Sequence, residues 1–320
     1  MLKIKEKKLS LAQEHALESQ HSATHSTPFS MFCHAVLIVC SLAAILPFML
    51  LVSSSFSDEG ALLRYGYSFF PRQFTTAAYD FLFQTNLRNI LNAYRISVTI
   101  TVVGLSIHML IAPALGYAVS RKDYPRRKIV LFFVLFTMLF NGGLVPQYIM
   151  WTQLWGIGNT IYALILPNLI TNGFMIMLYM NNFRSNIHPA LIEAAKIDGA
   201  GELYIYRKIA LPLSLPILAT VGLMVGVNYW NDWMNGLYYI NDPNLFSLQV
   251  FLNTILNNVQ ALLSLADAGV GGELAVAAAD MPTTAIRMAI AVVGVIPILV
   301  LYPFFQKYFI RGISLGGVKE

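Results

Sequence analysis

The chain has 320 residues, of which 57% are hydrophobic and only 12% are charged. Soluble domains carry about 25% charged residues, so this composition excludes an ordinary soluble protein. The formal net charge of +5 does not indicate nucleic-acid binding, because the basic residues are dispersed between long apolar runs. Continuous apolar runs favour helices over a barrel, so we expect an all-α integral membrane protein.

The chain opens with a polar, lysine-containing tail, residues 1–28, for which we predict no role. Six runs without Asp, Glu, Lys or Arg follow, and each reaches about the 20 residues that cross a bilayer as a helix. They are Phe29–Phe56, Ile96–Ser120, Ile129–Gln153, Ile157–Phe183, Ile209–Asn231 and Met288–Gln306. We therefore predict a six-span domain over residues 29–310, with outer segments at 57–94 and 238–286, a loop at 184–212 and a C-terminal tail at 311–320.

The distribution of Lys and Arg predicts the orientation of these spans. All but five of the 21 basic residues fall in the N-terminal tail, in the 121–128 loop, in the 184–212 loop or at the C-terminal end from Lys307 onward, and the other five are Arg64, Arg72, Arg88, Arg95 and Arg287. Basic residues concentrate on the cytoplasmic side of a membrane. Both termini and the 184–212 loop are therefore expected in the cytoplasm.

The stretch Glu193–Pro212 is a polar island between the fourth and fifth runs. Pro189 predicts the start of a helix, because proline is tolerated in the first turn. Gly199 is expected to end that helix, since glycine takes a positive φ freely. Residues 202–209 predict a second short helix, closed by Pro212. The stretch is thus expected to be a helix-turn-helix outside the bilayer.

Its sequence resembles the EAA loop of ABC importer permeases. The matching positions are Glu193, Ala194, Ala195, Gly199, Ile209, Leu211 and Pro212, with Asp198 directly before the glycine. The resemblance implies a cytoplasmic coupling element that docks on an ATP-hydrolysing subunit. The alternative interpretation is an ordinary charged connector between two spans.

The end of the fifth run is polar. Asn228, Asn231, Asp232 and Asn235 have the spacing i, i+3, i+4 and i+7, which predicts one helical face. Amides and carboxylates bind hydroxyls and aromatic rings stack on sugars, so this face and nearby Trp230 are candidates for a transport path. The alternative is structural: asparagines join helices in bilayers, and tryptophan anchors helices at the interface.

From about residue 29 to 320 the chain resembles carbohydrate-class permeases of type I ABC importers, including the second permease of the maltose importer. The segments Asn141–Pro146, Trp230–Trp233 and Phe309–Lys319 resemble a subgroup that serves complex saccharides. The resemblance implies a bacterial cytoplasmic (inner) membrane location and an oligosaccharide substrate, including uronate-containing ones. It also implies that Gly316, Gly317, Val318 and Lys319 contact the ATP-binding subunits.

The partners implied are a second, different permease, two ATP-binding subunits, an extracytoplasmic sugar-binding protein and membrane lipid, but no nucleic acid. The chain lacks a Walker sequence, so ATP and Mg²⁺ are expected only on partner subunits. No catalytic or metal-ligand constellation is predicted, so we do not expect an enzyme. The main alternative is an ion-coupled secondary transporter, which typically shows internal repeats and intramembrane carboxylates. The only such carboxylate predicted is Asp232.

Overall fold

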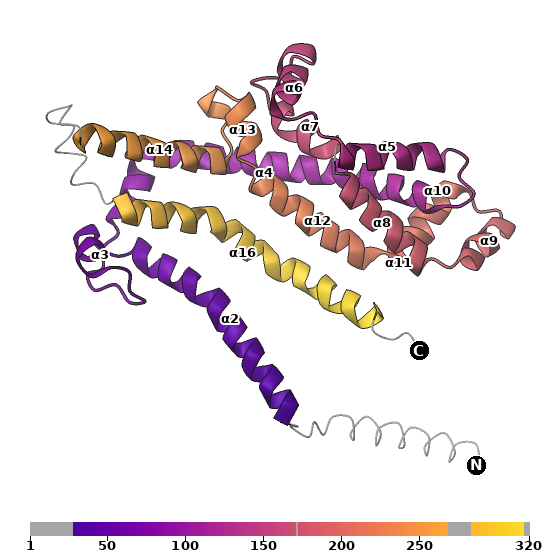
Figure 1. The fold of residues 1–320 in the computed structure, drawn as a ribbon, viewed down its shortest axis with the longest axis horizontal. Helices are drawn as coiled ribbons and strands as arrows, with labels where there is room; N and C mark the ends of the chain where they lie inside the picture. Colours follow the sequence, from indigo (N-terminus) through magenta and orange to yellow (C-terminus); the bar gives the residue numbers. More distant parts are fainter. Residues whose placement is uncertain (1–27, 171, 268–282, 317–320) are drawn as a thin grey trace.

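The computed structural model describes residues 28–170, 172–267 and 283–316, and these form helices joined by loops (Figure 1). Within these ranges the β pairing is one isolated antiparallel bridge, between Ser57 and Phe74. The prediction of an all-α chain is confirmed. Residues 1–27 of the predicted tail and Gly317, Val318 and Lys319 lie outside the described residues.

Among the described residues, three helices are each long and apolar enough to cross a membrane unaided: α2 (Pro28–Ser55), α4 (Ala77–Ser120) and α16 (Thr283–Gly316). Helix α2 packs along α16, yet most of its residues are exposed in the described chain, which suits a helix that also faces lipid or another subunit. Two of these helices are longer than the runs predicted. Residues 77–94, expected in an outer segment, form the first part of α4, and residues 311–316 continue α16.

The remaining predicted spans are bent. Helix α5 (Arg127–Leu139) is followed at 118° by α6 (Leu144–Ile149) and the π-helical turn η1 (Met150–Leu154). Helices α7 (Tyr162–Ile170) and α8 (Gly173–Asn186) meet at 50°. The described residues therefore contain up to six spans if each bent pair counts as one.

The third bend corrects the predicted fifth span. Helix α10 (Glu202–Ile205), the π-helical turn η2 (Tyr206–Ala210) and α11 (Leu211–Leu213) form one helical course. This course meets α12 (Leu215–Trp230) at 81°. The straight apolar helix of this predicted span therefore begins at Leu215 rather than at Ile209. The course ends at Leu213, one residue after Pro212, so the second short helix closes at the proline to within one residue, as predicted.

Helix α4 is the central element of the bundle, because α7, α8, α12 and α14 (Leu248–Asp267) all pack against it. The ring of Tyr229 on α12 lies where a Cβ on Gly104 of α4 would be, and its hydroxyl donates to the carbonyl oxygen of Ile165 at 3.0 Å. This glycine lets the two helices approach closely.

Short helices cap the two ends of the bundle. Figure 1 shows α9 (Pro189–Ile197), α10 and α11 at one end, and α3 (Glu59–Tyr65) and α14 at the other. Helices α13 (Met234–Tyr239) and η3 (Pro243–Leu245) connect α12 to α14. At the α3 end the carboxylate of Glu59 accepts hydrogen bonds from the N–H groups of Thr284 and Ala285 at 2.9 to 3.0 Å, which satisfies the first turn of α16.

Candidate functional site

A Schellman turn reverses the chain between α9 and α10. The N–H of Ala200 donates to the carbonyl oxygen of Ala195 at 2.9 Å, and the N–H of Gly199 donates to that of Lys196 at 3.0 Å. Gly199 has a φ of +80°, as this turn requires. Helix α9 begins with His188 as N-cap and Pro189 in its first turn. The predicted helix-turn-helix is therefore confirmed, including the role of the glycine.

The predicted coupling residues divide into an outward and an inward set. Glu193, Ala194, Asp198, Gly199 and Pro212 are exposed. Ala195 is buried, and Ile209 and Leu211 pack against the same buried cluster, which also contains side chains of α4, α8 and α12. The inward set anchors the turn on the bundle, which leaves the outward set free to meet another surface.

The outward surface of the turn is apolar as well as charged. Ile197 is 87% exposed, and Leu203 and Tyr204 are exposed beside the turn. Large apolar side chains grouped at one exposed site often mark a protein interface. Ile197 and Glu193 both belong to α9, four residues apart, so an apolar and a charged group are offered on the same short helix.

Four charged residues, which we call the coupling cluster, tie this turn to the end of α4: Arg121, Asp123, Lys196 and Glu202. The Lys196 ammonium lies 3.0 Å from Asp123 Oδ2 and 2.9 Å from Glu202 Oε1. The Arg121 guanidinium lies 2.6 Å from Asp123 Oδ2 and 3.5 Å from Glu202 Oε1. Each charge thus meets two opposite charges, which defines the position of the turn relative to α4.

The electrostatics of the coupling cluster favour its ionised form. Hydrogen bonds, first from Arg121 and then from Lys196, hold the pKa of the Asp123 carboxyl well below its usual range. The hydrogen bond to Glu202 is the largest cause that raises the pKa of Lys196, followed by that to Asp123. Asp123 and Lys196 are therefore both charged at neutral pH.

A second polar site lies where α12 ends. Asp232 Oδ2 accepts hydrogen bonds from Asn168 Nδ2 and from Asn235 Nδ2, each at 2.6 Å. Its Oδ1 accepts from the backbone N–H of Asn235 at 3.2 Å. The carboxylate joins α7, the α12–α13 turn and the start of α13, and its oxygens are occupied by protein donors.

The expectation of one helical face for Asn228, Asn231, Asp232 and Asn235 is wrong. Helix α12 ends at Trp230, and Asn231 is its C-cap. The Asp232 carboxylate competes with the helix by binding a backbone N–H three residues ahead, which is how short polar side chains end helices. Asn235 therefore lies on α13, a different helix from Asn228.

Trp230 is buried between helices rather than directed to a cavity. Its indole N–H donates to the carbonyl oxygen of Gly294 on α16 at 3.2 Å, and its ring lies 6.1 Å from that of Tyr94. It joins α12 to α16 and α4. We therefore leave Trp230 out of the proposed transport path.

Asn231 and Trp233 instead line a cavity of about 470 Å³ between the α12–α13 turn, α14 and α16. We call this the path cavity, and its polar lining comprises Asn231, Gln249, Asn253 and Arg287. The amides donate and accept hydrogen bonds, the indole ring offers a flat apolar face, and the guanidinium offers a positive charge. This combination suits a sugar with an acidic group.

Residues 93–315 match the model of a family described as "Binding-protein-dependent transport system inner membrane component", which covers more than half of the chain. The chain belongs to this family of permeases. It is 36% identical to the Polygalacturonan/rhamnogalacturonan transport system permease protein YtcP of Bacillus subtilis (strain 168), over 91% of this chain and 98% of that protein. It is 28% identical to the Arabinooligosaccharides transport system permease protein AraQ of Halalkalibacterium halodurans, over 86% of this chain and 91% of that protein.

The permease also resembles a solved structure, described as that of a bacterial ABC transporter involved in the import of the acidic polysaccharide alginate. The TM-score is 0.71 at 28% identity, and the match covers 90% of this chain and 98% of that one. The predicted family and the type I importer fold are therefore confirmed. The permease is an inner-membrane transport component, as expected.

Sequence reasoning missed several residues of both sites. Arg121 and Glu202 are 81 positions apart, and the sequence marks each only as one charge among several. Gln249 and Asn253 of the path cavity are one helical turn apart on α14. The periodicity of that helix predicts a polar face, but it does not predict that this face lines a cavity.

Proposed function

We propose that this permease carries a uronate-containing oligosaccharide into the cytoplasm, driven by ATP hydrolysis on partner subunits. The proposed complex contains a second, different permease, two ATP-binding subunits and an extracytoplasmic sugar-binding protein. Two relatives support the substrate class, because one is described as a polygalacturonan/rhamnogalacturonan permease and one as part of an alginate importer. In this mechanism ATP binding elsewhere shifts an equilibrium between inward-open and outward-open bundles.

The observation that carries the ATP-driven mechanism is the turn at Gly199. It is an ordered reversal with exposed apolar residues, fixed to α4 by the coupling cluster and to the interior by Ala195, Ile209 and Leu211. A plain connector needs none of these features. Movement of a docked ATP-binding subunit would be transmitted to α4 and α12 together.

The proposed orientation places this turn in the cytoplasm together with both termini. It rests on the Lys and Arg distribution, because the coupling cluster and the basic loop at 121–128 lie at the same end of α4. The path cavity and α14 then belong to the outer half. By resemblance, Gly316, Gly317, Val318 and Lys319 would contact the ATP-binding subunits from the same cytoplasmic side.

The path cavity supports a saccharide as the transported solute. Asn231 and Trp233 are both exposed and lie near Arg287, so a hydroxyl, a ring face and a carboxylate could each find a partner there. Asn228 and Asn235 do not line this cavity. We therefore propose no direct sugar contact for them and keep them only as residues next to the proposed path. Asp232 is proposed to hold the wall in place through Asn168 and Asn235.

The test is uptake by the complete importer in proteoliposomes with the binding protein outside and ATP enclosed. The proposal expects oligogalacturonate uptake that requires ATP and the binding protein. Uptake that persists without ATP and collapses when an ion gradient is dissipated would instead establish a secondary transporter. Uptake of neutral oligosaccharides alone would retain the importer and reject the uronate class.

A further inference from the structure

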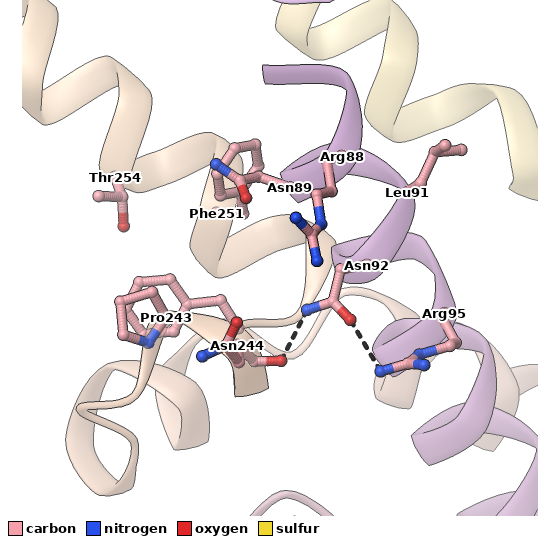
Figure 2. A pocket seen from close by; sticks show the side chains of 10 residues that line it. Arg88, Asn89, Leu91, Asn92, Arg95, Pro243, Asn244, Phe251 and Thr254 are labelled. Atoms are coloured by element: carbon pink, nitrogen blue, oxygen red, sulfur yellow. Dashed lines mark hydrogen bonds between the residues drawn. The ribbon is translucent and has the colours of Figure 1, made fainter. Parts of the chain in front are cut away.

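A second, larger cavity of about 750 Å³ lies between the first part of α4, η3 and α14. We call it the arginine pocket, because Arg88 and Arg95 line it together with Asn89, Asn92, Asn244, Phe246, Phe251 and Thr254. Figure 2 shows the guanidinium groups of Arg88 and Arg95 on either side of the Asn92 amide. The path cavity lies along other residues of the same α14.

One of the arginines is held in place by its neighbours. Arg95 Nη2 donates to Asn92 Oδ1 at 2.9 Å, and Asn92 Nδ2 donates to the carbonyl oxygen of Asn244 at 2.7 Å (Figure 2). This chain of hydrogen bonds connects α4 to the η3 loop. Arg95 is thus oriented by an amide rather than neutralised by an acid.

The pocket is positively charged without compensation from its own lining. Its lining contains two arginines and no Asp or Glu, and no described residue forms an ion pair with Arg88 or Arg95. Arg88 and Arg95 are seven residues apart on one helix, so their charges fall on one face. Uncompensated arginines that converge on one cavity are typical of anion recognition.

The length of α4 places the pocket at the membrane edge opposite the coupling cluster. Arg95 precedes Ser120, the last residue of α4, by 25 residues, which is about 38 Å of helix. The hydrocarbon core of a bilayer is about 30 Å thick. With Ser120 at one edge of that layer, an upright α4 puts both arginines beyond the opposite edge, where a water-soluble acidic ligand can reach them.

We propose that the arginine pocket is an entry site that binds the carboxylate of a uronate residue before the saccharide reaches the path cavity. This rests on the proposed function and adds a selectivity step to it. The guanidinium groups bind the carboxylate, the Asn89 amide and Thr254 bind hydroxyls, and Phe251 offers a ring face. The volume lies in the range of small-ligand cavities, about 300–1,000 Å³, and exceeds what a single acidic side chain of a partner protein fills.

The experiment measures uptake of a galacturonate tetramer and of its methyl ester, which has the same rings without the charge. The importer, with its binding protein, carries Arg88→Gln together with Arg95→Gln. We expect the preference for the acid over the ester to fall about tenfold or more, as for the loss of a charge-assisted hydrogen bond. Arg88→Lys with Arg95→Lys should retain part of the preference, because it retains the charge.

Arg64→Gln is the matched control, since Arg64 is exposed on α3 at the same end and does not line the pocket. It should keep the wild-type preference, and recovery of the assembled complex from detergent checks the folding of each variant. An unchanged preference in the double Gln variant would overturn the inference while leaving the proposed function intact. Equal loss for both sugars, with weaker association of the sugar-free binding protein, would overturn it in favour of a protein carboxylate. No uptake of either sugar by the wild type would reject the proposed function itself.

Discussion

At the scale of single residues, the two candidate sites depend on backbone geometry at Gly199 and on hydrogen bonds to Asp232. Gly199 has room around it, because a Cβ built there meets nothing within 4 Å. A substitution therefore acts through the φ of +80° and not through a clash. Asp232 is the opposite case, since its φ is not positive and its side chain has three hydrogen bonds to lose.

Gly199→Val should leave the membrane helices inserted but weaken assembly with the ATP-binding subunit. The left-handed backbone costs a residue with a β-carbon about 1–2 kcal/mol, so the turn should loosen. Recovery of the ATP-binding subunit with the purified permease measures this. Gly201→Val is the control, because Gly201 has a φ of −75° and equally free space. If the Gly199 and Gly201 variants assemble equally well, the turn has no docking role.

Asp232→Ala should lower both uptake and thermal stability, whereas Asn231→Ala should lower uptake alone. Removing the carboxylate leaves the amides of Asn168 and Asn235 without their acceptor, at a cost of about 1–3 kcal/mol. Asn231 is exposed and lines the path cavity. Melting of the detergent-solubilised complex and uptake into proteoliposomes separate the two effects. Normal uptake by the Asn231 variant would remove this residue from the path.

At the scale of elements, the coupling cluster joins the α4–α5 loop to the α9–α10 turn through charge alone. Because the pKa of Asp123 is lowered, its stabilising contribution is present above about pH 4 and is lost as acid protonates it. Because the pKa of Lys196 is raised, its contribution is present below about pH 10 and is lost as strong alkali deprotonates it. The connection is thus constant across the physiological range.

Lys196→Glu should uncouple ATP hydrolysis from uptake, since it places a third acid beside Asp123 and Glu202. The ratio of ATP hydrolysed to sugar taken up, measured in the same vesicles, should no longer be fixed. Reversing all four charges, with Arg121→Glu, Asp123→Lys, Lys196→Glu and Glu202→Lys, recreates every opposite pair of the coupling cluster and should restore part of this ratio. Wild-type uptake by the Lys196→Glu variant would show that the coupling cluster has no role in coupling.

How far the sequence predicts these elements depends on how local their signals are. The α9–α10 turn was predicted because Pro189 and Gly199 act within a few residues of themselves. The end of α12 was not predicted, because the polar spacing from Asn228 to Asn235 suits one continuous helix equally well, and the bond from the Asn235 N–H to Asp232 that ends α12 leaves no mark on that spacing. The first half of α4 was placed in a loop because its polar residues, including Asp80, Arg88 and Arg95, interrupt the apolar run although they recur at helical spacing.

At the scale of the whole molecule, the proposed orientation can be tested with single cysteines in a variant in which Cys33 and Cys40 are replaced by serine. Cysteines at Arg126 and Lys208 should resist an impermeant thiol reagent added outside intact cells, and one at Asn244 should react. All three positions are exposed in the structure, so burial by the described chain would not explain a difference. External labelling at Lys208 would invert the topology and reject the cytoplasmic docking of the turn.

The 44 residues of α4 connect two distant places, with Arg88 and Arg95 near its beginning and Arg121 directly after its end. A helix in this position lets each end bias the other. If a sugar carboxylate at the outer end favours one arrangement of α4, then by thermodynamic linkage an ATP-binding subunit that favours the same arrangement must raise the affinity for that carboxylate by an equal factor. The sugar and the ATP-binding subunit would then each raise the affinity of the permease for the other by the same factor. Measuring either change in affinity would therefore give both.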